Sequence, residues 1–570
     1  MRARIWLGER MFGSDLRNPL IWAAVVGFFG AWISIGFKEA TDWAHALYAG
    51  SHAGYIESFM ALAWWQRLLV PALGGLLAGL TLHLSKRFSR QANSTDYMEA
   101  VVVGDGNLGV KSSLVKSTSA WLSASSGASI GREGPLVLLA ALGASIFGRV
   151  LKFPLARKRL IVACGAAAGI ASAYNAPIAG AFFVAEIVLG SLAMESFGPL
   201  VISSVVATLV TRQHYGAEAM YSAPVFTFQG NHELLPYLML GLACGVVSPW
   251  YLGFLKGSEV AFSKLKLPPW ARLALGGLIV GALAIVHPEV TGNGRGLVFG
   301  ILHHPGTWQT LAVILLFKVL ATGATFGSGA VGGVFTPTLF AGAAVGYLFG
   351  VGAEGLFPGW NLQPGAFGLV GMGAFLAATT AAPVMAIIML FELTLNYQIL
   401  PPLMLASVVG YYVCRSFTQR SLYKEALARK GAAAVAQHLS TLRIGDLMQE
   451  DAGTLAPTAS FGEIAKSFLR SRHDYLHVVD ESRYLGAICL HDIKSYLDEP
   501  ELESLVIAQD VMRDDHPCLR PDMSMAEALD FFGASQSERL PVTDEKGVFL
   551  GVVTKTDVWL FLAGKPRKAA

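Results

Sequence analysis

One carboxylate, Glu133, lies inside a glycine-rich break in a strongly apolar part of the sequence. It belongs to the segment SSGASIGREGP, residues 125–135, in which small residues lead up to a proline. We expect a helix whose first turn follows Gly134–Pro135. The free N–H groups at such a helix start, together with the helix dipole, attract an anion without a full positive charge. This kind of binding suits a permeating ion, which must also leave.

Glu133 is itself an acid at the mouth of this expected anion site. As a carboxylate it would compete with the anion for the same N–H groups, and when protonated it would release them. An ionisable residue within a membrane segment is a functional candidate by default. The sequence therefore predicts that Glu133 is a gate linking anion passage to protons. The structural alternative is a helix-start residue paired with Arg132.

The sequence contains an internal repeat. GAAAGIASAYNAPIAGAFFVAEI, residues 165–187, recurs without gaps as GMGAFLAATTAAPVMAIIMLFEL, residues 371–393. Upstream of each copy lies a glycine-rich break that ends in proline, at residues 131–135 and 332–337. Apolar helices interrupted at corresponding positions of two repeats predict a transporter or channel whose binding site lies where the broken helices meet.

The composition requires a membrane environment for most of the chain. Hydrophobic residues make up 53% of the 570 residues and charged residues 15%, and the mean hydropathy is +0.50. Some apolar spans are shorter than the roughly 20 residues of a perpendicular crossing, which predicts tilted or half-crossing helices. The continuous apolar spans include 20–37, 68–84, 234–255, 273–286, 311–321 and 399–413.

Charge divides the chain into two parts. From residue 431 onward there are 22 acidic and 14 basic side chains, which predicts a separate soluble domain, whereas the preceding part carries a net charge of +11. Basic residues flank the first pair of spans and, by the positive-inside rule, place both ends of that pair in the cytoplasm. They are Arg2, Arg4, Arg10 and Arg17 before it and Lys86, Arg87 and Arg90 after it. We expect a multi-pass inner (cytoplasmic) membrane protein with cytoplasmic N- and C-termini and no nucleic-acid partner.

The cysteines indicate neither a disulfide framework nor a metal site. The chain has five cysteines, an odd number, and their spacing does not match a zinc site. No nucleophile–base set emerges from the sequence either. We therefore expect no enzymatic activity, no metal and no required cofactor.

Several motifs together resemble the CLC family of chloride channels and chloride/proton antiporters. GREGP, the NAP of residues 175–177, GVFTP at 333–337 and the tyrosine of RSLYKEAL occur in the family's order over about residues 18–430. DYMEAV at 96–101 is similar to the ClcB-like bacterial branch. The resemblance implies an all-α polytopic membrane fold with an internal inverted repeat, and a homodimer with one pore per subunit.

The resemblance also assigns the anion-binding positions. It implies that Glu133 is the external gate, that the amides of Val334 and Phe335 face a central chloride ion, and that Tyr423 offers this ion a hydroxyl. The family usually has a serine at an inner site, and ungapped counting puts Ala92 there, which leaves the choice among chloride, nitrate and similar anions open. The full set is Gly131, Arg132, Glu133, Gly134, Val334, Phe335, Tyr423 and the position of Ala92.

A second departure concerns the proton path. Antiporters of the family commonly carry an internal proton-transfer glutamate where this chain has Ile187, which cannot carry a proton. Glu186 is either a substitute carrier or a structural acid that satisfies helix ends, as its repeat partner Glu392 suggests. We therefore expect passive chloride conduction gated by Glu133. Chloride/proton antiport remains an alternative, and so does a nucleotide-sensing membrane protein with a non-conducting pore.

The tail resembles a pair of CBS domains, which are α/β regulatory modules. The CLC resemblance implies a membrane domain at 1–430, with repeat halves at roughly 20–215 and 234–416. The CBS resemblance implies modules at 440–498 and 505–564. In GVVTKTD, Thr554 and Asp557 fit the pattern that binds an adenine nucleotide. The first half keeps Asp492 but has Cys489 where a hydroxyl is usual. The alternative is a purely structural pair that stabilises the dimer.

Overall fold

The chain divides into two compact units, Met1–Ala428 and Arg429–Ala570, which we describe separately. In the first unit, eight described helices are long and apolar enough to cross a membrane. The computed structural model describes residues 17–49, 54–88, 96–102, 104–221, 226, 230–304, 306–423, 443–449, 453–470, 475–493, 506–534 and 538–555.

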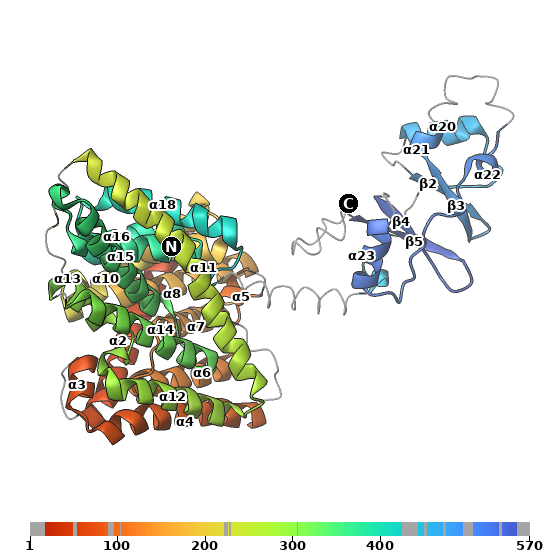
Figure 1. The fold of residues 1–570 in the computed structure, drawn as a ribbon. Coiled ribbons are helices and arrows are strands. Elements are labelled where there is room, and N and C mark those ends of the chain that lie inside the picture. The colour runs from red at the N-terminus through yellow and green to blue at the C-terminus, as the bar shows by residue number, and fades with distance from the viewer. Residues whose placement is uncertain are drawn as a thin grey trace, which may run out of the picture. The chain divides into compact units, whose positions relative to one another are not determined.

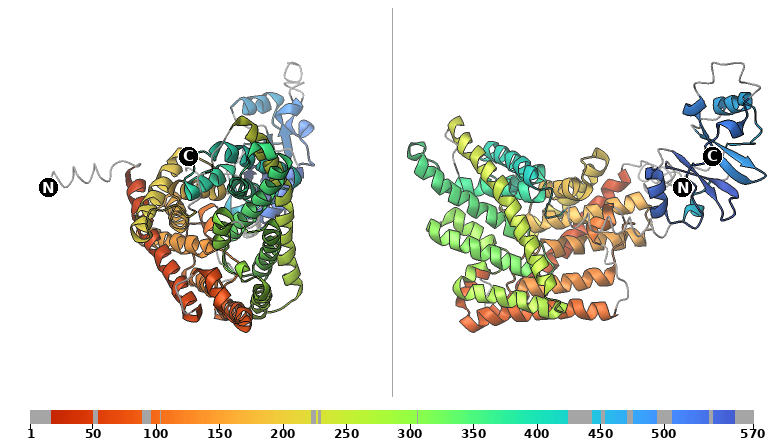
Figure 2. Two further views of the ribbon diagram at one scale, coloured as in Figure 1. Left: turned by 60° about the vertical axis from the view of Figure 1, so that its left-hand side comes forward. Right: turned by 45° about the vertical axis from the view of Figure 1, so that its right-hand side comes forward.

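The described elements of the membrane unit are all helical (Figures 1 and 2). The first half contains α2 (Arg17–Ala49), α3 (Tyr55–Ala61), α4 (Trp64–Phe88), α5 (Tyr97–Val102), α6 (Val110–Ser125), α7 (Glu133–Val150), α8 (Leu155–Tyr174), α9 (Pro177–Phe182), the π-helical η1 (Phe183–Leu189) and α10 (Met194–Tyr215). The second half contains η2 (Asn231–Glu233), α11 (Leu234–Lys264), α12 (Pro269–Val286), η3 (Pro288–Val290), α13 (Arg295–His303), α14 (Trp308–Gly327), α15 (Phe335–Leu356), η4 (Pro358–Trp360), α16 (Pro364–Thr380), α17 (Pro383–Thr394) and α18 (Leu400–Phe417).

Corresponding breaks separate α8 from α9 and α16 from α17. Asn175 ends α8 and Ala381 ends α16, both in the left-handed region, with φ of 57° and 61°. Pro177 and Pro383 then begin the next helices, where a proline needs no N–H partner. The sequence repeat is therefore a repeat of helix, left-handed turn and helix.

Small residues let the repeated helices pack closely. A Cβ on Gly165 of α8 would lie 2.7 Å from the carbonyl oxygen of Ala140 in α7. The equivalent Gly371 of α16 packs in the same way on α15, where a Cβ would lie 2.5 Å from the Gly342 oxygen. Backbone-to-backbone packing of this kind is typical of helices in membranes. α4 and α12, the third helices of the two halves, also lie side by side (Figure 2).

The start of α7 differs from the sequence prediction. The helix begins at Glu133, so Pro135 lies inside its first turn instead of preceding it. A proline is tolerated there because the first N–H groups of a helix have no internal partner. The gate candidate is thus the first helical residue of α7.

The tail contains a three-stranded and a two-stranded sheet. β2 (Tyr475–Asp480) pairs in parallel with β1 (Thr454–Leu455) and antiparallel with β3 (Arg483–Cys489), and β4 (Arg539–Thr543) pairs antiparallel with β5 (Phe549–Thr554). The remaining elements are η5 (Ile444–Asp446), α20 (Phe461–Arg470), α21 (Leu490–Ile493), α22 (Ala508–Val511) and α23 (Met525–Ala534).

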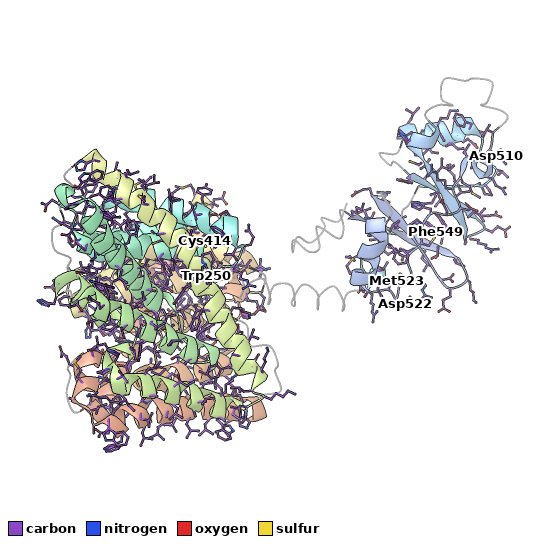
Figure 3. The ribbon with its side chains drawn as sticks, in the orientation of Figure 1. Trp250, Cys414, Asp510, Asp522, Met523 and Phe549 are labelled. Carbon is purple, nitrogen blue, oxygen red and sulfur yellow. The ribbon has the colours of Figure 1, made fainter. Side chains whose placement is uncertain are left out.

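In the tail, the segment that begins each half packs in the hydrophobic core of the other half. Ile444, from the first half, is buried in the core formed by α23, β4 and β5, and its N–H donates to the Met523 carbonyl at 3.0 Å. Ala508, which begins α22, is buried in the core formed by α20, β2 and β3. Phe549 of β5, which is labelled in Figure 3, packs on the ring of Tyr484 of β3, with ring centroids 6.0 Å apart. The halves therefore share their cores.

Candidate anion gate

The two glycine-rich breaks meet directly. The Gly131 N–H donates to the Gly333 carbonyl at 2.6 Å, and the Gly333 N–H donates back to the Gly131 carbonyl at 3.1 Å. This backbone bridge joins the segments that precede α7 and α15. It places the starts of two broken helices, one from each repeat, beside each other.

Neither helix start is closed by a side chain. The residues that precede the two helices, Arg132 and Val334, make no side-chain capping hydrogen bond. The free N–H groups of a first turn, together with the helix dipole, favour an anion. Val334 and Phe335 are buried, with 7% and 1% of their surfaces exposed, so an anion at this position would be largely removed from water.

The Glu133 carboxylate lies across this junction. Its Oε1 accepts a hydrogen bond from the Thr336 hydroxyl of α15, and that hydroxyl lies 3.1 Å from the hydroxyl of Tyr174 of α8. Its Oε2 is buried and has no hydrogen-bond partner among the described residues. The side chain that begins α7 is therefore held on one side by the other repeat.

Glycine makes room for this carboxylate. A Cβ on Gly131 would overlap the Glu133 carboxylate, and a Cβ on Gly333 would lie 3.1 Å from its Oε2. Both glycines have ordinary φ values, so space and not backbone conformation requires them. Gly134 lies equally close to the second break, because its Cβ would lie 3.3 Å from the backbone of Gly332.

Arg132 forms an ion pair with Asp42 of α2, with Nη1 and Oδ1 2.6 Å apart. This contact differs from the pairing of Arg132 with Glu133 that the structural alternative required. The sequence offered no signal for it, because Asp42 is 90 residues away in the chain.

A row of aromatic rings connects the gate to Tyr423. The Phe335 ring lies 5.1 Å from the ring of Tyr174 and 6.4 Å from that of Phe183, centroid to centroid. Phe183 in turn contacts Tyr423, with a centroid distance of 5.5 Å. Tyr423 and Phe335 therefore border one aromatic cluster from different parts of the sequence.

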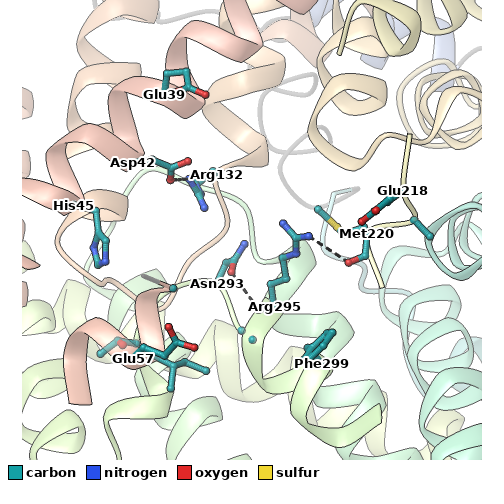
Figure 4. A pocket seen from close by; sticks show the side chains of 16 residues that line it. Glu39, Asp42, His45, Glu57, Arg132, Glu218, Met220, Asn293, Arg295 and Phe299 are labelled. Atoms are coloured by element: carbon teal, nitrogen blue, oxygen red, sulfur yellow. Dashed lines mark hydrogen bonds and ion pairs between the residues drawn. The ribbon is translucent and has the colours of Figure 1, made fainter. Parts of the chain in front are cut away.

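Two cavities adjoin the gate. The larger, of about 900 Å³, has Arg132 and Arg295 among its walls, together with acidic residues such as Glu57 and Glu218 (Figure 4). A smaller cavity, of about 60 Å³, is lined by Glu133 and shares both arginines with the larger one. Glu133 thus borders a small internal space that shares wall residues with the larger cavity, which we call the vestibule.

Glu186 caps a helix of the other repeat. Its carboxylate accepts hydrogen bonds from the N–H groups of Val384 and Met385, at 3.3 and 2.7 Å, at the start of α17. Glu392 does the same at the start of α9, accepting from Ile178 and Ala179 at 3.0 and 2.7 Å. The reciprocal geometry is what a helix-capping role requires.

Ile187 follows Glu186 in the π-helical segment η1 and packs, partly buried, against the apolar core. Several other expected positions are described incompletely. Ala92 and Asp557 lie outside the described residues, and the side chain of Asp492, in α21, is not described. Thr554 is buried at the end of β5.

Sequence reasoning missed three residues of the gate. Thr336 donates a hydrogen bond to Glu133 Oε1, the Tyr174 hydroxyl contacts that of Thr336, and Asp42 forms an ion pair with Arg132. Thr336 lies within GVFTP and Tyr174 directly precedes NAP, so the motifs contained both residues. The one signal in the sequence was that both residues carry a hydroxyl group, which can take part in hydrogen bonds near a carboxylate.

The family profile described as voltage gated chloride channel matches residues 74–415, and the CBS domain profile matches residues 444–499 and 508–558. A ClcB-like protein of Ralstonia nicotianae is 52% identical over 411 residues, which are 71% of this chain and 96% of that protein. The voltage-gated ClC-type chloride channel ClcB of Escherichia coli (strain SMS-3-5 / SECEC) is 41% identical over 415 residues, or 72% and 99% of the two chains.

Solved structures with a similar fold include a slow cyanobacterial Cl⁻/H⁺ antiporter, with a TM-score of 0.65 and 26% identity over 73% of this chain and 98% of that chain. A eukaryotic CLC transporter has a TM-score of 0.60 and 18% identity, and covers 95% of this chain and 97% of its own. The second likeness extends over both units of this chain.

Proposed function

Because the chain belongs to the voltage gated chloride channel family, we propose that it conducts chloride passively across a lipid bilayer, with Glu133 as the gate. The observation that carries this proposal is the junction of the two helix starts, where the Glu133 carboxylate occupies the region in which free N–H groups favour an anion. A protonated or displaced Glu133 would leave that region to chloride.

The central anion is proposed to contact the amides of Val334 and Phe335 and the hydroxyl of Tyr423. Support comes from the uncapped start of α15 and from the aromatic cluster that links Phe335 through Phe183 to Tyr423. Gly131, Arg132 and Gly134 would form the outer part of the path. Ala92, at the usual position of a serine, would contribute no hydroxyl.

Passive conduction is favoured by the residues on the inner side of the gate. Ile187 offers no titratable group, and both oxygens of the Glu186 carboxylate accept hydrogen bonds at the start of α17. A carboxylate that caps a helix in this way is poorly placed to carry protons. Chloride/proton antiport is the second candidate, since a solved relative with 26% identity is named a Cl⁻/H⁺ antiporter.

The gate is tested by Glu133→Gln, which mimics the protonated side chain. Chloride flux in reconstituted vesicles should rise and lose its dependence on external pH. Glu392→Gln, a neutralised carboxylate away from the gate, should keep the pH dependence of the wild type. Unchanged flux and an unchanged pH response in Glu133→Gln would reject the role.

We further propose a homodimer in the inner (cytoplasmic) membrane, with both termini in the cytoplasm and no enzymatic activity. The tail is proposed to bind an adenine nucleotide through Thr554 and Asp557, with a weak or empty half at Asp492 and Cys489. The melting temperature of the full chain should rise with ATP, ADP or AMP. Absence of a shift in wild type at millimolar nucleotide, or an equal shift in Thr554→Val, would leave the tail a structural role only.

A further inference from the structure

The small cavity beside Glu133 is lined by this residue but not by its hydrogen-bond partner Thr336. Its walls come from α2, α7, α8, α10 and α13 and from the loops next to them, and they include Ser34, Lys38, Glu133, Ser172 and Tyr215. Its volume is about 60 Å³. None of the roles proposed above uses this space.

Three residues that line the cavity each have a buried oxygen atom without a hydrogen-bond partner in the part of the chain that the structure describes. These atoms are Ser34 Oγ, Ser172 Oγ and Glu133 Oε2, and the three residues are only 4, 9 and 7% exposed. More than about 90% of buried polar groups in proteins have a partner, either protein or ordered water. A polar space of this size exceeds the roughly 10–15 Å³ that one water molecule needs.

We propose that this cavity is a hydration site, in which ordered water bridges Glu133 Oε2 to Ser34, Ser172 and the ammonium group of Lys38. Lys38 would then be a positioning residue that favours the ionised form of Glu133 and so sets the pH at which the gate opens. This inference rests on the proposed gating role of Glu133. In this proposal the Glu133 carboxylate has two polar contacts, the Thr336 hydroxyl at Oε1 and water at Oε2.

Lys38 is held at the edge of the cavity. Its Nζ lies 3.4 Å from the centre of the Tyr215 ring, a cation–π contact, and the Tyr215 hydroxyl donates to Glu39 at 2.7 Å. The partly buried ammonium is thereby fixed on the side of α2 and α10.

Other charged or titratable groups near Glu133 come from every neighbouring element. Arg132 is paired with Asp42, and Arg295 donates to the Met220 carbonyl at 3.3 Å, so each of these cations has another partner. Lys38 is the cation that lines the small cavity but not the large vestibule. These groups are Lys38, Glu39 and Asp42 of α2, Arg132 before α7, Tyr174 of α8, Tyr215 of α10, Tyr221 after α10, Arg295 of α13 and Tyr423 after α18.

The sign of the effect follows from charge. A positive group near a carboxylate favours its ionised form, so removing the Lys38 charge lets Glu133 protonate at higher pH. Lys38→Met should therefore move the pH of half-maximal chloride flux upward by at least about 0.5 unit, as expected for one partly screened charge. Lys38→Arg, which keeps the charge, should restore most of the wild-type midpoint.

The hydroxyls are tested by the double variant Ser34→Ala/Ser172→Ala. Loss of the water-bridging groups leaves the carboxylate less well solvated, so the midpoint should again move upward. Ser407→Ala of α18 is the matched control, because Ser407 is also buried and its hydroxyl has no partner among the described residues, but it does not line this cavity. Its midpoint should stay at the wild-type value.

The outcomes separate this inference from the gate itself. If Glu133→Gln keeps its pH dependence, the gate proposal fails. If Glu133→Gln loses the pH dependence but Lys38→Met and the double serine variant keep the wild-type midpoint, only the hydration site fails. A shift of the midpoint in Ser407→Ala equal to that in the double serine variant would also overturn the hydration site. As a check independent of flux, a high-resolution cryo-EM map of the full chain in lipid nanodiscs should contain water density in the cavity, and an empty cavity would overturn the proposal.

Discussion

At the scale of single residues, the site depends on glycines, which have no side chain, as much as on residues that form hydrogen bonds. Gly131 and Gly333 leave the space that the Glu133 carboxylate fills, while Thr336 supplies its hydrogen bond. A carboxylate held by one hydroxyl is bound more weakly than one held by several N–H groups, because a hydrogen bond to a charged group contributes about 1.5–3 kcal/mol. The geometry is suited to a side chain that leaves its position during function.

A methyl group at residue 131 should displace the gate. In Gly131→Ala the new Cβ overlaps the carboxylate, so Glu133 must leave Thr336, and we expect higher chloride flux with a weaker pH response. Gly36→Ala in α2 is a suitable control, because no atom outside the local helix lies within 4 Å of the new Cβ. Wild-type flux in Gly131→Ala, measured on protein that is folded by thermal melting, would contradict the close packing described here.

At the scale of elements, the two repeats stabilise each other through reciprocal caps. Glu186 closes the start of α17 and Glu392 closes the start of α9. A carboxylate at a helix N-terminus is favoured by the dipole and by its hydrogen bonds. Three short helical segments from the two halves of the chain, α9, η1 and α17, are thereby fixed to one another.

Neutralising either cap should lower stability by a similar amount. We expect Glu186→Gln and Glu392→Gln each to lower the free energy of unfolding by about 1–2 kcal/mol, since each removes the charge from two hydrogen bonds. Thermal melting in detergent compares the two variants directly. A large loss in Glu392→Gln with none in Glu186→Gln would show that Glu186 is not primarily a cap, and would reopen its role as a proton carrier.

The tail also has a carboxylate that accepts hydrogen bonds at a helix start, in an exposed position. The Glu527 carboxylate at the start of α23 accepts hydrogen bonds from the N–H and the hydroxyl of Ser524, both at 2.8 Å. These bonds hold the pKa of Glu527 below its usual value. A carboxyl whose pKa is lowered in the folded state stabilises that state above its unfolded pKa, and this contribution is lost as the pH falls through the folded pKa.

Acidification should therefore loosen α23 in the wild type more than in Glu527→Gln. Hydrogen exchange of the α23 amides in the full chain, corrected for the intrinsic pH dependence of exchange, should show faster opening as the pH drops from about 5 to 3. The variant should open faster at neutral pH and change less on acidification. Glu481→Gln, in the turn between β2 and β3, should behave like the wild type; an identical pH response in Glu527→Gln would contradict the prediction.

Several elements were predictable because their signal is local. The helix–turn–proline units at 165–187 and 371–393 follow from glycine, proline and apolar periodicity, and the structure confirms the all-helical membrane fold with its repeat. The spans α7, α10 and α15 were missed as continuous crossings, because glycine, serine and alanine lower their hydropathy. The start of α7 was placed three residues late, after Pro135 instead of at Glu133, since a proline fits inside a first turn as well as before one.

Contacts between distant residues were not predictable from one sequence. The Arg132–Asp42 ion pair, the Glu133–Thr336 hydrogen bond and the Gly131–Gly333 bridge each join segments separated by 90 to more than 200 residues. No local pattern reports such distances. The repeat nevertheless indicated that the two glycine-rich breaks belong to one site, because broken helices of paired repeats meet at the binding site.

At the scale of the whole molecule, the question is whether proton and chloride movement are coupled. Coupling requires a continuous set of proton carriers from both sides of the membrane to the gate. Glu133 lies beside a polar cavity, whereas the other candidate position has the hydrocarbon Ile187 next to a Glu186 that is engaged as a cap. An uncompensated charge in such a region costs several kcal/mol.

We therefore expect the reversal potential of the reconstituted chain to follow the chloride gradient alone, at about 59 mV for a tenfold gradient of a monovalent ion. Opposed pH gradients should change the size of the current, because Glu133 titrates, but not the voltage at which the current vanishes. Vesicles with a chloride gradient and a trapped pH dye provide the second measurement, in which protons should not move uphill. Sustained uphill movement would replace passive conduction by antiport. If Glu186→Gln but not Glu392→Gln then abolished it, Glu186 would be the inner carrier, because the two variants lose equivalent caps and differ only in the repeat in which the carboxylate lies.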